Sequence, residues 1–341
     1  MDRSAARAYV YAKASGMLAK SFTGSRASRL FAAKSLRELY GLLFDDEVPA
    51  VPETLLAKTI EKKAQEQFVA QFTGLLKNYA VPDAVLVALL RSYDYDNLKE
   101  IAAALCYKES SMPDIVDIGE YSMLSYRRWP DLAGITADSP VSWYHTVPRS
   151  DEQQLFDQKL DLHYTQSLWQ AAKKLPLVER AAVLELIRRE IVYRNVMWVL
   201  RLKVYYRYDA DAIVPMLAYE HDGAGKTDAF AGDALAVVYA EPDVWDAWRD
   251  WKYADFLNPH EDGVVWEIDP AWVERMLDRD LQRRYARAFH QQPDSALVLF
   301  AWFKIKQNEL HYIRSVTEGL RLNVETEHVM AAAGVAGASG R

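Results

Sequence analysis

The sequence of 341 residues has a single cysteine, Cys106, and no apolar run long enough to cross a bilayer. One cysteine cannot form a disulfide scaffold or a thiolate metal site, and a transmembrane helix needs about 20 apolar residues. The first thirty residues also lack the apolar core of a secretory signal. Half of the residues are hydrophobic and 26% are charged, which excludes a disordered chain. We therefore expect a folded globular protein of a reducing compartment, without a membrane span.

Glycine and proline are also scarce, with 14 and 13 residues, so the turns that many short strands require are missing. Apolar residues instead recur every three or four positions in 86–105, 184–205 and 299–320, which predicts three long helices and an all-α fold. Asp269 before Pro270 is typical of a helix start. The segments 49–52, 129–148, 221–232 and 258–263 are predicted to be loops.

Acidic residues are absent from the segment Arg3 to Arg37, which has eight lysines or arginines although the whole chain carries a formal charge of −7. By contrast, 241–280 has twelve acids and four bases. This asymmetry suggests surfaces for differently charged protein partners, and Arg26 and Arg29 are the candidate partner-binding residues. Solvated helix faces, or an organelle transit peptide at the N-terminus, are the alternatives. The acidic pI and the lack of a binding motif argue against nucleic acid.

Three motifs that resemble catalytic sites are incomplete. The string 223–227 ends like a phosphate-binding loop, but Glu220 stands where that loop needs its first glycine. The seven histidines never pair at the spacing of metal ligands, and no serine lies in a Gly-x-Ser-x-Gly elbow. The acids 45–47 are followed by Pro49, so they are predicted to leave a helix rather than to hold magnesium on one. We expect no catalytic, cofactor-binding or metal-binding residues.

Two asparagines, Asn97 and Asn195, interrupt apolar stripes. An unpaired buried amide costs about 1–3 kcal/mol, so each should find hydrogen-bond partners. We predict that they fix the register between helices. The alternative is that the stripes bend and leave both amides half exposed.

The segments around these asparagines form part of an internal repeat. Asp-Tyr-Asp-Asn-Leu-Lys at 94–99 corresponds to Val-Tyr-Arg-Asn-Val-Met at 192–197, and 308–314 occupies the same place in the third stripe. Basic residues follow near the end of each of these helices. The repeat predicts helical domains at 1–112, 113–218 and 219–330, with 331–341 as a disordered tail.

Together with Tyr-Val-Tyr-Ala-Lys at 9–13 and the segment 303–314, these features resemble the C subunit of the bacterial and archaeal V/A-type rotary ATPases, or ATP synthases, whose eukaryotic counterpart is the d subunit. The resemblance covers nearly all of the chain except the tail. In the third unit Lys306 and Glu309 match the family pattern, whereas Tyr312 stands where an asparagine is usual.

The resemblance implies three similar helical domains arranged as a funnel around a pseudo-threefold axis. It implies a non-catalytic subunit without a cofactor, which couples the central rotor shaft to the membrane proteolipid ring during ATP-driven or ATP-forming proton or sodium transport. Such a subunit is cytoplasmic and peripheral on the membrane. Residues Asn97, Asn195, Glu309 and Tyr312 are its structural or register candidates. An all-helical enzyme of the isoprenoid-processing kind, with an aromatic-lined pocket, and a generic helical scaffold are the alternatives.

Overall fold

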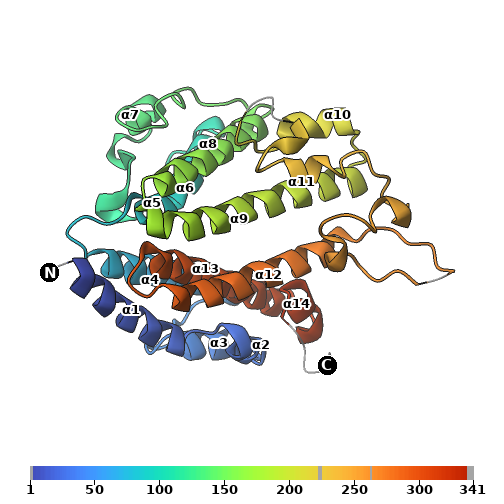
Figure 1. Cartoon of the computed structure of the whole chain (residues 1–341). Coiled ribbons are helices and arrows are strands. Elements are labelled where there is room, and N and C mark those ends of the chain that lie inside the picture. The colour runs from blue at the N-terminus through green and yellow to red at the C-terminus, as the bar shows by residue number, and fades with distance from the viewer. Residues whose placement is uncertain (1–2, 222–224, 262, 336–341) are drawn as a thin grey trace. The chain divides into compact units, whose positions relative to one another are not determined.

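The computed structural model describes residues 3–221, 225–261 and 263–335, and within these ranges the chain is helical with no β-strand (Figure 1). The predicted all-α class is confirmed. The long helices are α1 (Arg3–Lys20), α4 (Glu53–Leu76), α6 (Ser92–Cys106), α8 (Gln153–Lys173), α9 (Leu177–Val204), α12 (Pro270–Gln291) and α13 (Ala296–Arg321). Shorter helices are α2 (Ser28–Phe31), α3 (Leu36–Leu43), α5 (Ala84–Leu90), α7 (Leu132–Thr136), α10 (Ala210–Ile213), α11 (Gly232–Leu235) and α14 (Thr326–Ala332).

The chain divides into two compact units, and each is built from three separate stretches. The first unit comprises Met1–Lys20, Lys58–Arg180 and Gln292–Phe303. The second unit comprises Ser21–Ala57, Ala181–Gln291 and Lys304–Arg341. Segments from both ends of the sequence thus enter both units, and the three repeats expected from the sequence stay a prediction.

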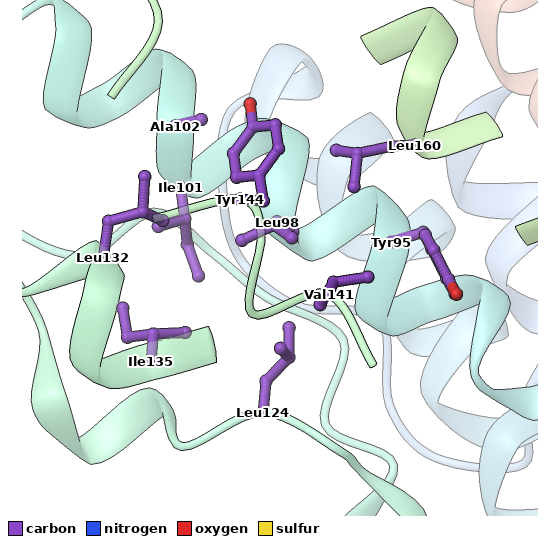
Figure 2. Close-up of a cluster of buried hydrophobic side chains, with 10 residues drawn as sticks. All are labelled: Tyr95, Leu98, Ile101, Ala102, Leu124, Leu132, Ile135, Val141, Tyr144 and Leu160. Atoms are coloured by element: carbon purple, nitrogen blue, oxygen red, sulfur yellow. The ribbon is translucent and has the colours of Figure 1, made fainter. Parts of the chain in front are cut away.

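A hydrophobic cluster in the first unit joins α6 to the chain that follows it (Figure 2). Helix α6 packs against α8, which also packs against α5. The cluster consists of side chains from α6, from α7 and its flanking loops, and from α8: Tyr95, Leu98, Ile101, Ala102, Leu124, Leu132, Ile135, Val141, Tyr144 and Leu160. Burial of these side chains holds the loop-rich segment after α6 onto the helices.

A second buried group in the first unit is aromatic. Phe68 and Phe72 of α4 stack on Trp302 at centroid distances of 5.9 and 6.0 Å. Phe303 lies against both phenylalanines at 4.9 and 4.8 Å. Several aromatic residues of the sequence are therefore core material, as their helical spacing predicts.

Polar groups explain where some of the helices begin and break. Asp269 accepts a hydrogen bond from the backbone of Ala271 at 2.9 Å, which confirms it as the start signal of α12. The stripe 86–105 is not one helix, because the chain breaks at Arg91 between α5 and α6. There the Ser92 hydroxyl bonds back to the Leu89 carbonyl at 2.8 Å, a bond that competes with continuous helix formation.

The predicted loops are partly confirmed. Residues 49–52 lie between helices, but 129–148 includes α7, and 221–232 includes a short 3₁₀ turn at Gly225–Thr227. Helix α14 continues to Ala332, inside the segment expected to be a disordered tail. Residues 336–341 lie outside the described residues.

Candidate functional site

Asn195 on α9 is buried, with 3% of its surface exposed, and holds the backbone of a distant loop. Its amide nitrogen donates to the carbonyls of Ala218 at 2.8 Å and Phe230 at 3.0 Å. Its amide oxygen accepts from the N–H of Ala218 at 2.9 Å. One side chain thus satisfies three buried backbone groups of a segment that has no regular partner of its own.

Asn97 on α6 repeats this arrangement in the first unit. Its amide nitrogen donates to the carbonyl of Val116 and to the hydroxyl of Tyr126, both at 2.8 Å. Its amide oxygen accepts from the N–H of Val116 at 2.9 Å. We call this motif, in which a buried polar side chain on a long helix bonds to the backbone of a loop, a helix–loop clasp.

Both asparagines are thus buried and paired rather than half exposed, and they bond to loop backbone and to a tyrosine hydroxyl instead of to another long helix. Their role in interhelical register stays a prediction.

On α13 a comparable buried polar residue is Glu309, which is 5% exposed. Its carboxylate accepts the backbone N–H of Phe22 and forms an ion pair with Lys306. Lys306 also donates to the Ser21 hydroxyl at 3.1 Å. The third clasp therefore holds a loop from the start of the chain, 287 residues away in sequence.

Tyr312, the residue that replaces the usual asparagine, makes an aromatic contact rather than a hydrogen bond to loop backbone. Its ring meets Phe31 of α2 edge-on at 6.1 Å. The neighbouring Asn308, which the sequence repeat aligned with Asn97 and Asn195, is only half-buried. In this helix the clasp has moved to a carboxylate, and an aromatic pair secures the same N-terminal segment.

Asp94 on α6 is a structural residue that sequence reasoning missed. It is fully buried and accepts from the hydroxyls of Ser122 and Tyr126 at 2.7 Å and from the N–H of Met123 at 2.8 Å. Burial raises the pKa of this carboxyl, and the three donors offset part of that shift. An acid on an apolar stripe, three residues before Asn97, was the available signal.

Asp228 has the equivalent role beside Asn195 and was also missed. It accepts the backbone N–H groups of Glu220, His221, Phe230 and Ala231 at 2.8–3.2 Å. Desolvation opposes its charge, but these donors hold the pKa below its ordinary value. Asp228 directly follows the string 223–227 that resembles a phosphate loop, and its carboxylate stabilises the turn there by accepting backbone N–H groups.

The basic N-terminal segment divides between internal and surface positions. Arg7 of α1 bonds to Glu179 at 2.8 Å and also approaches Asp83. Arg26 ends a 3₁₀ turn, Gly24–Arg26, and is half-buried. Arg29 on α2 is exposed and lies over the Phe22 ring at 5.8 Å. Only part of the predicted basic surface is therefore available to a partner.

A surface groove in the second unit lies next to Arg26 and Arg29, since their sequence neighbours Ser25, Ala27 and Ser28 line it. It has a volume of about 750 Å³ and is lined mainly by small and apolar side chains, among them Ala27, Phe31 and Met330, with the cations Lys34 and Arg279. Glu327 is the only carboxylate among the described residues that line it. An enzyme that ionises an isoprenoid would need several acids converging on such a space, and they are missing here.

The described residues provide little other chemistry. In residues 3–221, 225–261 and 263–335, no group of three or more His, Cys, Asp or Glu could hold a metal ion. Asp46 accepts a hydrogen bond from the Tyr40 hydroxyl at 2.9 Å just after α3 ends, in agreement with its interpretation as part of a helix exit.

Residues 223 and 224 of the apparent phosphate loop lie outside the described range. No described helix has the length and hydropathy to span a membrane.

The described part of the chain is thus all-helical, and buried polar side chains on its long helices clasp loops at Asn97, Asn195 and Glu309. Residues 10–332 match the family described as ATP synthase (C/AC39) subunit, and the chain belongs to that family. An uncharacterized protein of Treponema pallidum (strain Nichols) is 31% identical over 324 residues, which cover 93% of each chain. The resemblance to the C-subunit family of the V/A-type ATPases is thereby confirmed.

Proposed function

We propose that this chain is a non-catalytic central-stalk subunit, a socket that couples the rotor shaft of a V/A-type rotary ATPase to its membrane proteolipid ring. Membership of the ATP synthase (C/AC39) family supports a rotary ATPase subunit. The observation that carries the finer proposal is the threefold recurrence of the helix–loop clasp, at Asn97, Asn195 and Glu309. In this role the protein is cytoplasmic and peripheral on the membrane.

The clasps support three similar helical domains arranged as a funnel around a pseudo-threefold axis. Each domain would consist of one long helix and the loop that it clasps. In the third domain that loop comes from the N-terminal segment at Phe22, so the first and last parts of the chain together complete one repeat. A coupling part benefits from this design, because contacts distributed about an axis carry torque better than contacts on one side.

The proposal predicts that tagged chain, purified from detergent-solubilised membranes, brings the shaft and proteolipid subunits with it. A double variant, Arg26→Glu with Arg29→Glu, should weaken this assembly at physiological salt, because it reverses charge on the exposed N-terminal segment. Lys58→Glu on α4 with Lys77→Glu, directly after the end of α4, changes the charge equally at exposed positions and serves as the control. Purification without either partner would contradict the socket, whereas an unaffected double variant would contradict only the role of the two arginines.

A further inference from the structure

Helix α12 carries a stripe of arginines that the family assignment does not explain. Arg275, Arg279, Arg283 and Arg287 follow one another at intervals of four residues, so they share one face of the helix. The last three are exposed and form no ion pair within the part of the chain that the structure describes. Like charges at this spacing repel one another, so the stripe weakens the isolated helix.

Two of the three acids of α12, Glu274 and Asp280, make contacts with α9. Glu274 forms an ion pair with Arg201 of α9 at 2.6 Å, and Asp280 accepts from Tyr193 of α9 at 2.7 Å. Arg284 pairs with Asp280. Two of the acids of the helix thus make internal contacts, the third, Asp278, is exposed next to Arg279, and Arg279, Arg283 and Arg287 are left to the solvent.

The stripe meets the groove at Arg279, which lines it together with Lys34. Lys34 is exposed, and its side chain has no ion pair among the described residues. The apolar part of the groove is recessed, because Ala27 and Phe31 at its floor are only 1% and 2% exposed and Met330 beside them is half-buried. A recessed apolar surface cannot insert into a bilayer, but it can receive side chains from a helix that lies along it.

We propose that the groove and the arginine stripe together form a docking surface for a protein helix that is acidic on one face and apolar on the adjoining one. Acidic side chains spaced by about one turn would pair with Arg279 and Arg283, and apolar side chains would enter the groove beside Phe31. Charge complementarity favours such a helix over a basic or neutral one. The proposal concerns a surface that the socket function does not itself require.

The test uses the full chain and a synthetic 18-residue helical peptide with glutamates at every fourth position and leucines on the adjoining face. Arg279→Glu with Arg283→Glu should slow association by about tenfold or more, because surface charges mainly steer encounter. Ala32→Trp should reduce binding as well, because it fills the groove from an exposed position. A scrambled peptide of the same composition should bind more weakly than the amphipathic one.

Matched controls separate this surface from general charge and shape effects. Lys58→Glu on α4 with Lys77→Glu directly after it makes the same change of charge, and Ala70→Trp adds an indole at an exposed site of α4. Neither should alter peptide binding. Peptide binding that is absent, or equal in all variants, would overturn the proposal. A second result would also overturn it. If the unchanged protein binds vesicles of phosphatidylcholine and phosphatidylserine, and the Arg279→Glu with Arg283→Glu variant loses that binding while its peptide binding is unchanged, the occupant is lipid.

Discussion

Asn195 and Ala218 exchange two hydrogen bonds, one in each direction, at 2.8 and 2.9 Å. This pairing imitates the bonding of a β-ladder with a side chain in place of one strand. It gives a loop without secondary structure a fixed position on α9. Asn97 on α6 and Val116 form the same pair of hydrogen bonds, so α6 and α9 each hold a loop through the amide of one asparagine.

Replacing Asn195 with leucine should destabilise the protein by about 2–4 kcal/mol, since it leaves the backbone groups of Ala218 and Phe230 buried without partners. Urea unfolding followed by circular dichroism measures this loss. Asn308→Leu is the matched control, because Asn308 is half-buried and its side chain holds no loop backbone among the described residues. Similar midpoints for the two variants would show that the clasp contributes little.

The third clasp should govern protection of the N-terminal segment. Glu309→Leu removes the acceptor of the Phe22 N–H and leaves Lys306 without its carboxylate, so the Phe22 amide should exchange with solvent much faster. Glu309→Gln keeps an acceptor and should have a smaller effect. Hydrogen exchange followed by mass spectrometry measures both. Glu318→Gln, which breaks only an exposed ion pair with Arg321 on the same helix, should leave this protection unchanged.

Arg7 should contribute more to the free energy of unfolding than Arg3, although both arginines form ion pairs with acids. The side chains of Arg7 and Glu179 are only 12% and 9% exposed, and Glu179 also accepts from the backbone of Ala296 at 2.9 Å. Arg7→Met should therefore cost about 3 kcal/mol, because it leaves a carboxylate buried without its cation. Arg3 is 55% exposed, and Arg3→Met should cost less than about 1 kcal/mol. Equal unfolding free energies for the two variants would contradict this difference.

Asp278 should make stability depend on pH. Although part of Asp278 is exposed to solvent, desolvation by the surrounding chain, with the nearby charge of Glu274, raises its pKa to about 6 from an ordinary value of 3.8. The folded state thus binds the proton more tightly than the unfolded state, so this group lowers stability as the pH rises from about 4 to above 6.

The variant Asp278→Asn removes that dependence. It should melt at a higher temperature than the unchanged protein at pH 8, and the two should converge below about pH 4. Thermal unfolding at several pH values measures this, with Asp243→Asn at an exposed position as the control. A melting temperature at pH 8 equal to or below that of the unchanged protein would contradict the assignment.

The helices could be predicted because their apolar residues recur with the period of the α-helix, a pattern that is local in sequence. The placement of Asn97 and Asn195 on apolar stripes followed from the same pattern, but whether their amides are buried or half exposed was left open by it. The break at Arg91 did not, because it depends on the hydroxyl of Ser92 bonding back to Leu89 in place of continued helix. Asp228 was missed since its donors are backbone groups, which every sequence offers equally, and Asp94 was missed since its donors lie 28–32 residues away in the sequence.

By itself, the sequence determined the helical class, the family and the positions of Asn97 and Asn195 on apolar stripes, because periodicity and residue order are properties of neighbouring positions. Only the tertiary structure decided which backbone each of them holds. Glu309 receives its loop from Phe22, 287 residues away, and no local pattern encodes a partner at that distance. The spacing of the arginines of α12 can be read from the sequence. Their position beside a groove formed by α2 and α14 depends on how helices that are distant in sequence pack.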